Sequence, residues 1–193
     1  MEKYFTDNLT NDVVTVRNIL PKTTYGNRFY VSEEKIEFKL SFQTVNIPYR
    51  IYLTEPTDAE IATLSDVQKQ ILYCLYTRSC DGHLREKYVK KLLKSNIQEW
   101  CIPFIVKLCD EYVIEILYVI YESLRERENS DIKEFCINNK STICRSNSRM
   151  ISYWNEYYRK NICNLDEYVG NKLFRECIGY NTELEKQIGD LYE

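Results

Sequence analysis

The sequence predicts a mainly α-helical fold with a small N-terminal antiparallel β ribbon, which is an α+β organisation. Three observations lead to this class. Apolar and polar residues alternate within residues 28–53, whereas beyond residue 56 apolar residues recur at helical spacing. Residues 100–124 form the longest apolar stretch of the chain and contain few charged side chains. We therefore expect stacked helical hairpins with this stretch at their centre.

The charges in this apolar stretch decide between a membrane span and core helices. Asp110, Glu111 and Glu115 lie near its centre, and each would cost about 2.5–3.5 kcal/mol in the middle of a bilayer. Pro103 would also interrupt one continuous helix. The stretch is therefore predicted to form two short core helices that turn near Cys109 and Asp110, and no membrane segment is expected.

The composition is that of an ordinary globular protein. The chain has 193 residues, of which 44% are hydrophobic and 28% charged, and its formal net charge is −3. These values favour one well-filled core and argue against a polybasic nucleic-acid arm or a disordered acidic tail. The first residues have neither the basic start nor the apolar run of a signal peptide, so we expect a cytoplasmic protein.

The eight cysteines are interpreted as reduced core residues, because no export signal accompanies them and a free thiol packs as a small hydrophobe. Five of them lie within apolar helical patterns: Cys74, Cys101, Cys109, Cys136 and Cys177. Cys80 and His83 form a C-x-x-H pair, but a second ligand pair at usable spacing is missing. We therefore expect no metal site and no cofactor.

Residues 1–55 are expected to form an N-terminal helix and the β ribbon. Apolar residues at helical spacing predict a helix over residues 6–20, which Pro21 ends. Strands are predicted at residues 28–31, 36–42 and 49–53. A ribbon this small does not stand alone in water. It is therefore expected to pack on the helical part, residues 56–193, in one compact unit.

The second predicted strand has one apolar face. Its alternating apolar residues are expected to point into the core: Ile36, Phe38, Leu40 and Phe42. Pro48 is expected at the start or the edge of the third strand, because proline cannot donate to a sheet ladder.

Helix signals follow from residue 56 to the C-terminus. Ser65 and Gln68 form a capping box that begins a helix reaching about residue 78. Asp81-Gly82 breaks the pattern, and a second helix is predicted over residues 83–94.

The later helices are predicted mainly from their caps. Asn96 is expected to cap the next helix, with Pro103 in its early turns, and Asp110 is expected to cap a helix over residues 111–127. Further helices are predicted at residues 130–138, 148–160, 164–178 and from 181 to the end.

Two stretches of the helical part share one pattern. The matching residues are Asp81, Leu84 and Arg85 in the first stretch and Pro103, Asp110 and Val113 in the second. The pattern resembles that of HEAT-type helical repeats, in which a proline lies in the first helix, an aspartate in the turn, and a Val-Arg pair opens the second helix. The resemblance covers about residues 64–124. It implies stacked hairpins that hold proteins or, less often, nucleic acids along a surface.

Catalysis has little support in the sequence. The only histidine, His83, follows Asp81-Gly82 at a predicted helix start, where a solvated position is expected. Motifs typical of phosphate, dinucleotide, esterase and zincin sites are absent. Glu111 and Glu115 lie one helical turn apart, so an enzyme that relies on carboxylates and tyrosines stays open as an alternative.

Two segments carry the residues that we expect to bind a partner or nucleic acid. The first is a helix face with a single acid, Glu86, and the cations Arg85, Lys87, Lys90, Lys91 and Lys94. The second combines cations with an aromatic ring and comprises Arg145, Arg149, Tyr153, Arg159 and Lys160. A solvated helix surface also explains the lysines. Core packing also explains the aromatics of the second segment, since Met150, Trp154, Tyr157 and Tyr158 fall on one helical stripe.

The sequence therefore predicts a non-catalytic protein-interaction module or complex subunit with another protein as its partner. The first alternative is a nucleic-acid-binding protein that uses residues 87–94 or 145–160, because cations neutralise phosphates and aromatic rings stack on bases. The second alternative is the carboxylate-dependent enzyme.

Overall fold

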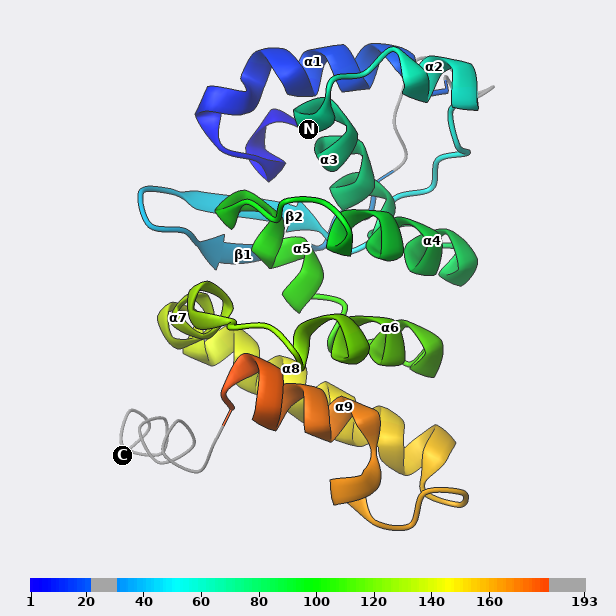
Figure 1. Cartoon of the computed structure of the whole chain (residues 1–193), viewed down its shortest axis with the longest axis vertical. Helices are drawn as coiled ribbons and strands as arrows, with labels where there is room; N and C mark the ends of the chain where they lie inside the picture. Colours follow the sequence, from blue (N-terminus) through cyan, green and yellow to red (C-terminus); the bar gives the residue numbers. More distant parts are fainter. Residues whose placement is uncertain (22–30, 181–193) are drawn as a thin grey trace. The chain divides into compact units, whose positions relative to one another are not determined.

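A computed structural model of the chain describes residues 1–21 and 31–180 (Figure 1). It confirms a mainly helical fold with a two-stranded antiparallel sheet near the N-terminus. The chain divides into two units, Met1–Phe104 and Ile105–Glu193, and the division falls inside residues 100–124. The division at residue 55 stays a prediction. The predicted helix from residue 181 and most of the predicted strand at 28–31 lie outside the described residues.

The first unit begins with the predicted N-terminal helix. Two 3-10 helices, Glu2–Tyr4 and Asp7–Leu9, precede α1, which spans Thr10–Ile19. The buried side chains of Val13 and Val16 lie on the face of α1 that packs against α3. The predicted helix over residues 6–20 is therefore confirmed.

The sheet consists of β1 (Lys35–Lys39) and β2 (Thr44–Pro48), which run antiparallel. Phe38 lies opposite Val45 in the register, and both side chains are buried. Pro48 does not begin a strand, since it is the last residue of β2, but it does lie on an edge strand of the two-stranded sheet. Its position at the end of the ladder removes the need for an amide hydrogen. The strand predicted at residues 49–53 is not formed. In that range, Ile51 forms isolated bridges with Val31 and Ser79.

The turn between the strands corrects a second expectation. Phe42 was expected on the buried face, yet its side chain is 98% exposed. β1 ends at Lys39, so the alternation of faces stops before Phe42. The Leu40 amide donates to the Gln43 carbonyl (2.8 Å), which closes the turn. The amide and hydroxyl of Ser41 both donate to Oε1 of Glu99, at 2.8 and 2.6 Å, so the turn is held in place.

Capping boxes begin two of the next helices. α2 (Asp58–Ala62) begins at a box formed by Thr57 and Glu60, which was not predicted. α3 (Asp66–Tyr76) begins at the predicted box of Ser65 and Gln68. α4 (Gly82–Leu93) is capped by Asp81, whose carboxylate accepts the amide of His83 (2.8 Å). α3 packs against α4 as a helical pair.

The central apolar stretch forms two short helices, as predicted. A 3-10 helix, Glu99–Cys101, leads into α5 (Ile102–Val106), which has Pro103 in its first turn, and α6 spans Ile114–Leu124. Both predicted caps are wrong: Gln98 precedes the first of these helices in place of Asn96, and Val113 precedes α6 in place of Asp110. Asp110 does not cap, because its buried carboxylate accepts two 2.6 Å hydrogen bonds from Nζ of Lys107.

The second unit continues with α7 (Ser130–Asn138), as predicted, and α8 (Lys140–Tyr153), which begins earlier than the predicted residue 148. A π-helical segment, Trp154–Tyr158, extends α8. The predicted helix over residues 164–178 is divided into a 3-10 helix, α9 and a second π-helical segment: Leu165–Glu167, Val169–Lys172 and Leu173–Ile178.

Gly170 allows α9 to approach α8 closely. A Cβ atom at this position would lie 2.6 Å from Cε1 of Tyr168 and 2.9 Å from Cγ of Met150. The glycine is therefore required by packing, which outweighs its low helix propensity. Gly179 has a φ of 78° and ends the second π-helical segment in the left-handed conformation that glycine adopts without strain.

The cysteines behave as predicted. All eight are free thiols, and the five expected in the core are buried. Burial raises the pKa of the Cys177 thiol to about 11, so this side chain stays neutral inside the fold.

Candidate functional site

The first predicted cationic face, on α4, separates into side chains with different surroundings. Arg85 is buried and donates to the backbone carbonyls of Ser79 (2.9 Å) and Cys80 (3.1 Å), so it helps to close the turn before the helix. Lys87 is exposed and forms an ion pair with Glu55 at 2.6 Å. Lys90 is likewise exposed.

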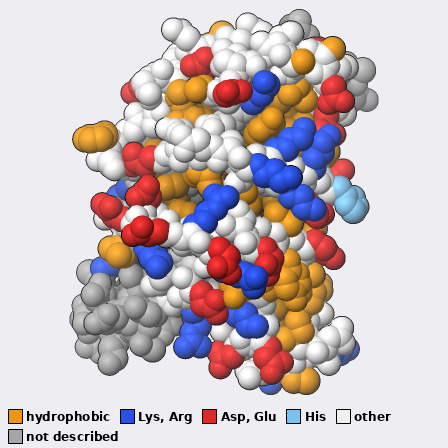
Figure 2. All heavy atoms as spheres, in the orientation of Figure 1, with side chains coloured by type: hydrophobic (Ala, Val, Ile, Leu, Met, Phe, Trp, Pro, Cys, Tyr) orange, Lys and Arg blue, Asp and Glu red, His pale blue; other side chains and the backbone are white. Residues whose placement is uncertain are grey.

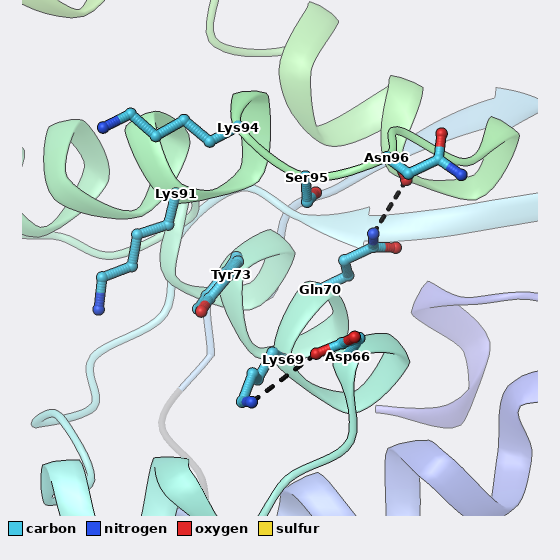
Figure 3. Close-up of a pocket in the computed structure, with 8 residues that line it drawn as sticks. All are labelled: Asp66, Lys69, Gln70, Tyr73, Lys91, Lys94, Ser95 and Asn96. Atoms are coloured by element: carbon cyan, nitrogen blue, oxygen red, sulfur yellow. Dashed lines mark hydrogen bonds and ion pairs between the residues drawn. The ribbon is translucent and has the colours of Figure 1, made fainter.

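Lys90 pairs with Glu86, one helical turn before it, at 2.6 Å. Exposed pairs of this kind contribute about 0–1 kcal/mol. Lys91 and Lys94 instead line a pocket of ≈ 370 Å³, together with Lys69 and Tyr73 of α3 (Figure 3). The structure therefore divides the predicted face into a buried arginine, two paired lysines and two pocket lysines.

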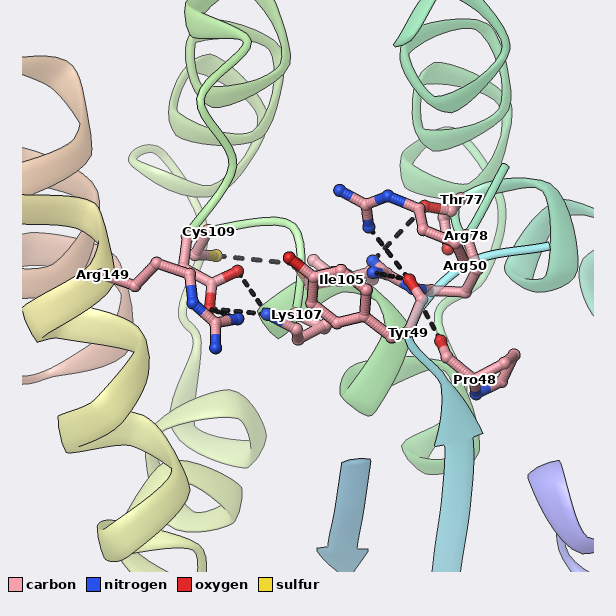
Figure 4. Close-up of polar contacts among 10 residues, drawn as sticks. Pro48, Tyr49, Arg50, Thr77, Arg78, Ile105, Lys107, Cys109 and Arg149 are labelled. Carbon is pink, nitrogen blue, oxygen red and sulfur yellow. Dashed lines mark hydrogen bonds and ion pairs between the residues drawn. The ribbon is translucent and has the colours of Figure 1, made fainter. Parts of the chain in front are cut away.

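The second predicted segment, in α8 and its π-helical extension, also has engaged arginines. Arg145 is exposed and donates to Oγ1 of Thr142 (3.2 Å). Arg149 reaches the buried carboxylate of Asp110 at 3.4 Å (Figure 4).

The remaining cations of this segment follow α8. The guanidinium of Arg159 lies 5.5 Å from the centroid of the Trp154 ring and donates to Oδ1 of Asn155 (3.1 Å). Lys160 is exposed. Arg145, Arg149 and Arg159 thus each contact another side chain of the second unit.

Three tyrosine rings form a cluster on the second unit, which we call the tyrosine triangle: Tyr112, Tyr153 and Tyr157. Their centroids lie 5.9 Å apart for Tyr112 and Tyr153 and 6.1 Å apart for the other two pairs. Tyr112 is 45% exposed and Tyr157 57% exposed. Figure 2 shows hydrophobic side chains gathered on this face over α6 and the C-terminal end of α8.

The exposure of Tyr157 corrects the expected buried stripe. Met150 and Trp154 are buried as expected. Beyond them the helix changes its hydrogen-bond pattern, because the amide of Arg159 donates to the carbonyl of Trp154, five residues before it (2.8 Å). A π-helical turn rotates the following side chains away from the α-helical stripe, and such turns are frequent at functional sites.

Hydrogen bonds and stacking hold the tyrosine triangle in position. The hydroxyl of Tyr158 donates to the carbonyl of Tyr112, which ties the π-helical segment to the residues before α6. The Tyr158 ring stacks on the buried ring of Tyr168 at 5.5 Å. Nε1 of Trp154 donates to the carbonyl of Ile162 (2.9 Å). Tyr153 was among the predicted binding residues, whereas Tyr112, which is distant in the sequence, was not.

Two buried polar clusters have structural roles. In the second unit, Lys107 and Arg149, whose side chains approach each other in Figure 4, both form ion pairs with the carboxylate of Asp110. In the first unit, buried Arg78 donates to the carbonyls of Pro48 (3.2 Å) and Tyr49 (2.7 Å) and so joins the end of β2 to the end of α3.

The residues considered for catalysis or metal binding do not assemble. Glu111 is buried and lies before α6, whereas Glu115 is exposed within it, so the two carboxylates form no buried pair. Cys80 and His83 are both exposed. Within residues 1–21 and 31–180, no three His, Cys, Asp or Glu side chains come together as metal ligands would.

No helix in the described part of the chain combines the length and apolar character needed to cross a bilayer. No family model, no curated protein and no solved structure matches the chain. Its function therefore has to be inferred from its own residues.

Proposed function

We propose that the chain is a non-catalytic protein-interaction module or complex subunit, and that the tyrosine triangle is the centre of its contact surface. The observation that carries this proposal is the close grouping of three partly exposed rings within 6.1 Å of one another. A contiguous exposed aromatic patch on a folded protein is typical of an interaction site, whereas single exposed apolar residues are common.

Tyrosine is well suited to such a surface. Its ring buries a large apolar area, its hydroxyl keeps a hydrogen-bond donor, and it loses little conformational entropy on binding. The triangle is also held in position in the free protein. The hydroxyl of Tyr158 donates a hydrogen bond to the carbonyl of Tyr112, and the side chain of Trp154 in the π-helical segment is buried. A pre-formed surface of this kind lowers the entropic cost of binding.

A protein is favoured over nucleic acid as the occupant because of the neighbouring charges. Single-strand binders combine aromatic rings with cations that contact phosphates. Here Arg149 pairs with Asp110 and Arg159 lies over Trp154, so these cations serve the fold. The exposed acids Glu115 and Glu156 lie in the same unit and would repel phosphates.

The HEAT-like relationship is part of the same proposal. It is supported by the packed pair of α3 and α4, by the cap that Asp81 provides, and by the position of Arg85 inside the hairpin. A cytoplasmic location is likewise proposed, because the buried cysteines pack as reduced thiols.

Affinity purification with quantitative mass spectrometry tests the tyrosine triangle. A partner captured by the full chain from its native cells is expected to be lost when Tyr112→Ala and Tyr157→Ala are combined, because removing aromatic anchors weakens binding about 30-fold or more. Tyr52→Ala is the matched control, since Tyr52 is 52% exposed in the other unit. Circular dichroism checks that each variant is folded.

Two outcomes would contradict the proposal. Equal capture of the partner by the double variant would remove the triangle from the interface. Tight binding of a single-stranded oligonucleotide that weakens steeply with salt and depends on Tyr157 would instead favour the nucleic-acid alternative.

A further inference from the structure

The pocket of the first unit lies between α3 and α4 and the residues that follow α4. Its volume of ≈ 370 Å³ falls within the range of sites that hold one small molecule. Figure 3 shows Lys69 and Tyr73 on α3, Lys91 on α4, and Lys94 at the C-terminal cap of α4. The helical pair thus places four polar side chains, distant in sequence, around one space.

The pocket carries a surplus of positive charge, although Glu55, which is not part of its lining, interacts electrostatically with Lys91. Three lysines line it against one carboxylate, Asp66. Asp66 lies 3.8 Å from Lys69 and is fully exposed, so it provides a weak partner. Within the described part of the chain, neither Lys91 nor Lys94 has a carboxylate within ion-pair distance, although both lysines outside the pocket on α4 have one at 2.6 Å.

Among the lysines of α4 and its C-cap, the two without a carboxylate within ion-pair distance are therefore the ones that line the pocket. A concave site with one sign of charge concentrates ligands of the opposite sign. Three lysines and one carboxylate leave a net surplus of positive charge in the pocket. An anion with two negative charges would balance this surplus, whereas a singly charged carboxylate would balance only part of it.

Tyr73 gives the pocket a neutral donor and an aromatic wall. Burial, and then the charge of Asp66, raises the pKa of its hydroxyl, so the group remains protonated at neutral pH and can donate a hydrogen bond. Nζ of Lys91 lies 5.7 Å from the centroid of the Tyr73 ring and 5.2 Å from that of Tyr88. The two aromatic faces thereby hold the ammonium group without neutralising it.

The floor of the pocket is pre-formed. Gln70 is buried, and its Nε2 donates to the carbonyl of Asn96 at 2.9 Å. This bond joins α3 to the residues after α4 and fixes the distance between the two sides that carry the lysines. A ligand therefore finds a site whose shape already exists, which reduces the cost of binding.

We infer that this pocket binds a doubly charged phosphate group, presented by a small phosphorylated molecule or by an inorganic phosphate compound. Lysine ammonium groups act as point charges for phosphate oxygens, and the Tyr73 hydroxyl supplies a further hydrogen bond. The inference does not depend on the tyrosine triangle, which lies on the other unit.

Isothermal titration calorimetry with the full chain tests this site, with sodium pyrophosphate and AMP as probes. Both are expected to bind at about 50 mM salt, where screening of the lysines is modest. Tighter binding of AMP would identify a nucleotide-like ligand whose base contacts the Tyr73 ring. Tighter binding of pyrophosphate would identify an inorganic or polyphosphate ligand.

Charge-neutral variants locate the binding. Lys91→Gln and Lys94→Gln are each expected to weaken both probes about tenfold or more, because each removes a charge-assisted hydrogen bond. Lys90→Gln is the matched control: it makes the same charge change next to Lys91, but its side chain pairs with Glu86 outside the pocket. It is expected to change affinity less than about twofold at this salt.

Three results would overturn the inference. The first is the absence of measurable binding of either probe up to about 1 mM, which is a weak affinity for a pre-formed site. The second is an equal loss in Lys90→Gln and Lys91→Gln, which would indicate general attraction to the helix. The third is unchanged affinity in Lys91→Gln and Lys94→Gln with unchanged circular dichroism.

Discussion

The basic segments of α4 and α8 look alike in sequence but use their cations differently. On α4 the lysines remain on the surface, where two are paired and two line a pocket. On α8 and its extension, Arg149 and Arg159 are engaged by Asp110 and Trp154. The exposed part of the α8 segment therefore includes Tyr157 of the tyrosine triangle together with Arg145 and Lys160.

The difference follows the chemistry of the two side chains. The planar guanidinium forms several directed hydrogen bonds and stacks on rings, so it is suited to internal contacts. Arg85 confirms the rule within α4 itself, since it is buried against backbone carbonyls while its lysine neighbours are exposed. Arg85, Arg149 and Arg159 thus contact groups of the fold itself, whereas the α4 lysines lie at the surface and two of them are paired with carboxylates.

Asp110→Asn should give the largest decrease in the free energy of unfolding, and it tests the difference between the two segments. The substitution removes the charge partner of Lys107, whose side chain is 3% exposed. Breaking a buried pair from one side costs about 3–5 kcal/mol. Denaturant unfolding should show this loss for Asp110→Asn, whereas Glu86→Gln on α4 should change the free energy of unfolding by about 0–1 kcal/mol. Similar decreases in the free energy of unfolding for both variants would contradict the proposed difference between the two segments.

Gly170→Ala should give an intermediate effect and tests the packing beneath the α8 segment. Helix propensity alone predicts that alanine stabilises α9 by about 1 kcal/mol. The new methyl group would collide with Tyr168 and Met150, and such overpacking costs about 1–3 kcal/mol. We expect a lower melting temperature in a thermal scan. A gain in stability would show that these side chains move aside easily.

Glu55→Gln should give the smallest effect and a pH-dependent one. Burial opposes ionisation of Glu55, but hydrogen bonds with Lys87 and Tyr88 and the nearby ammonium groups outweigh it and lower its pKa. The folded state therefore binds this proton less readily than the unfolded state. The stabilisation is present above the ordinary glutamate pKa of about 4.3 and is lost as the pH falls through the lower, folded value.

Unfolding of the native chain and of Glu55→Gln over a pH series measures this contribution. The two stabilities should differ by less than about 1 kcal/mol at pH 7 and converge in acid. A difference that grows as the pH falls would have the wrong sign for a lowered pKa.

Local signals made part of the fold predictable. The box of Ser65 and Gln68, the cap at Asp81 and the position of Pro103 depend on residues within one helical turn, so each could be read from adjacent sequence. The alternation within β1 was equally local and placed Phe38 in the core.

The predictions failed where the local structure depends on contacts with residues that are distant in the sequence. Aspartate often caps helices, which is why Asp110 was predicted to do so. Its carboxylate instead accepts hydrogen bonds from Lys107 and from Arg149, which lies 39 positions away in the sequence. The tyrosine triangle likewise required a π-helical turn and the approach of Tyr112 from another segment. The sequence identified Lys91 and Lys94 as part of a cationic face. It could not show that, in the described part of the chain, neither lysine has a carboxylate within ion-pair distance.

The exposed side chain of Phe42 allows the turn between β1 and β2 to be probed with a protease. Chymotrypsin-like proteases cut after large aromatic residues, and this side chain is 98% exposed. Cleavage also requires the backbone to extend, which the closed turn and the two bonds from Ser41 to Glu99 oppose. The rate of cutting after Phe42 therefore reports how often the turn detaches from Glu99, while the rest of the first unit remains folded.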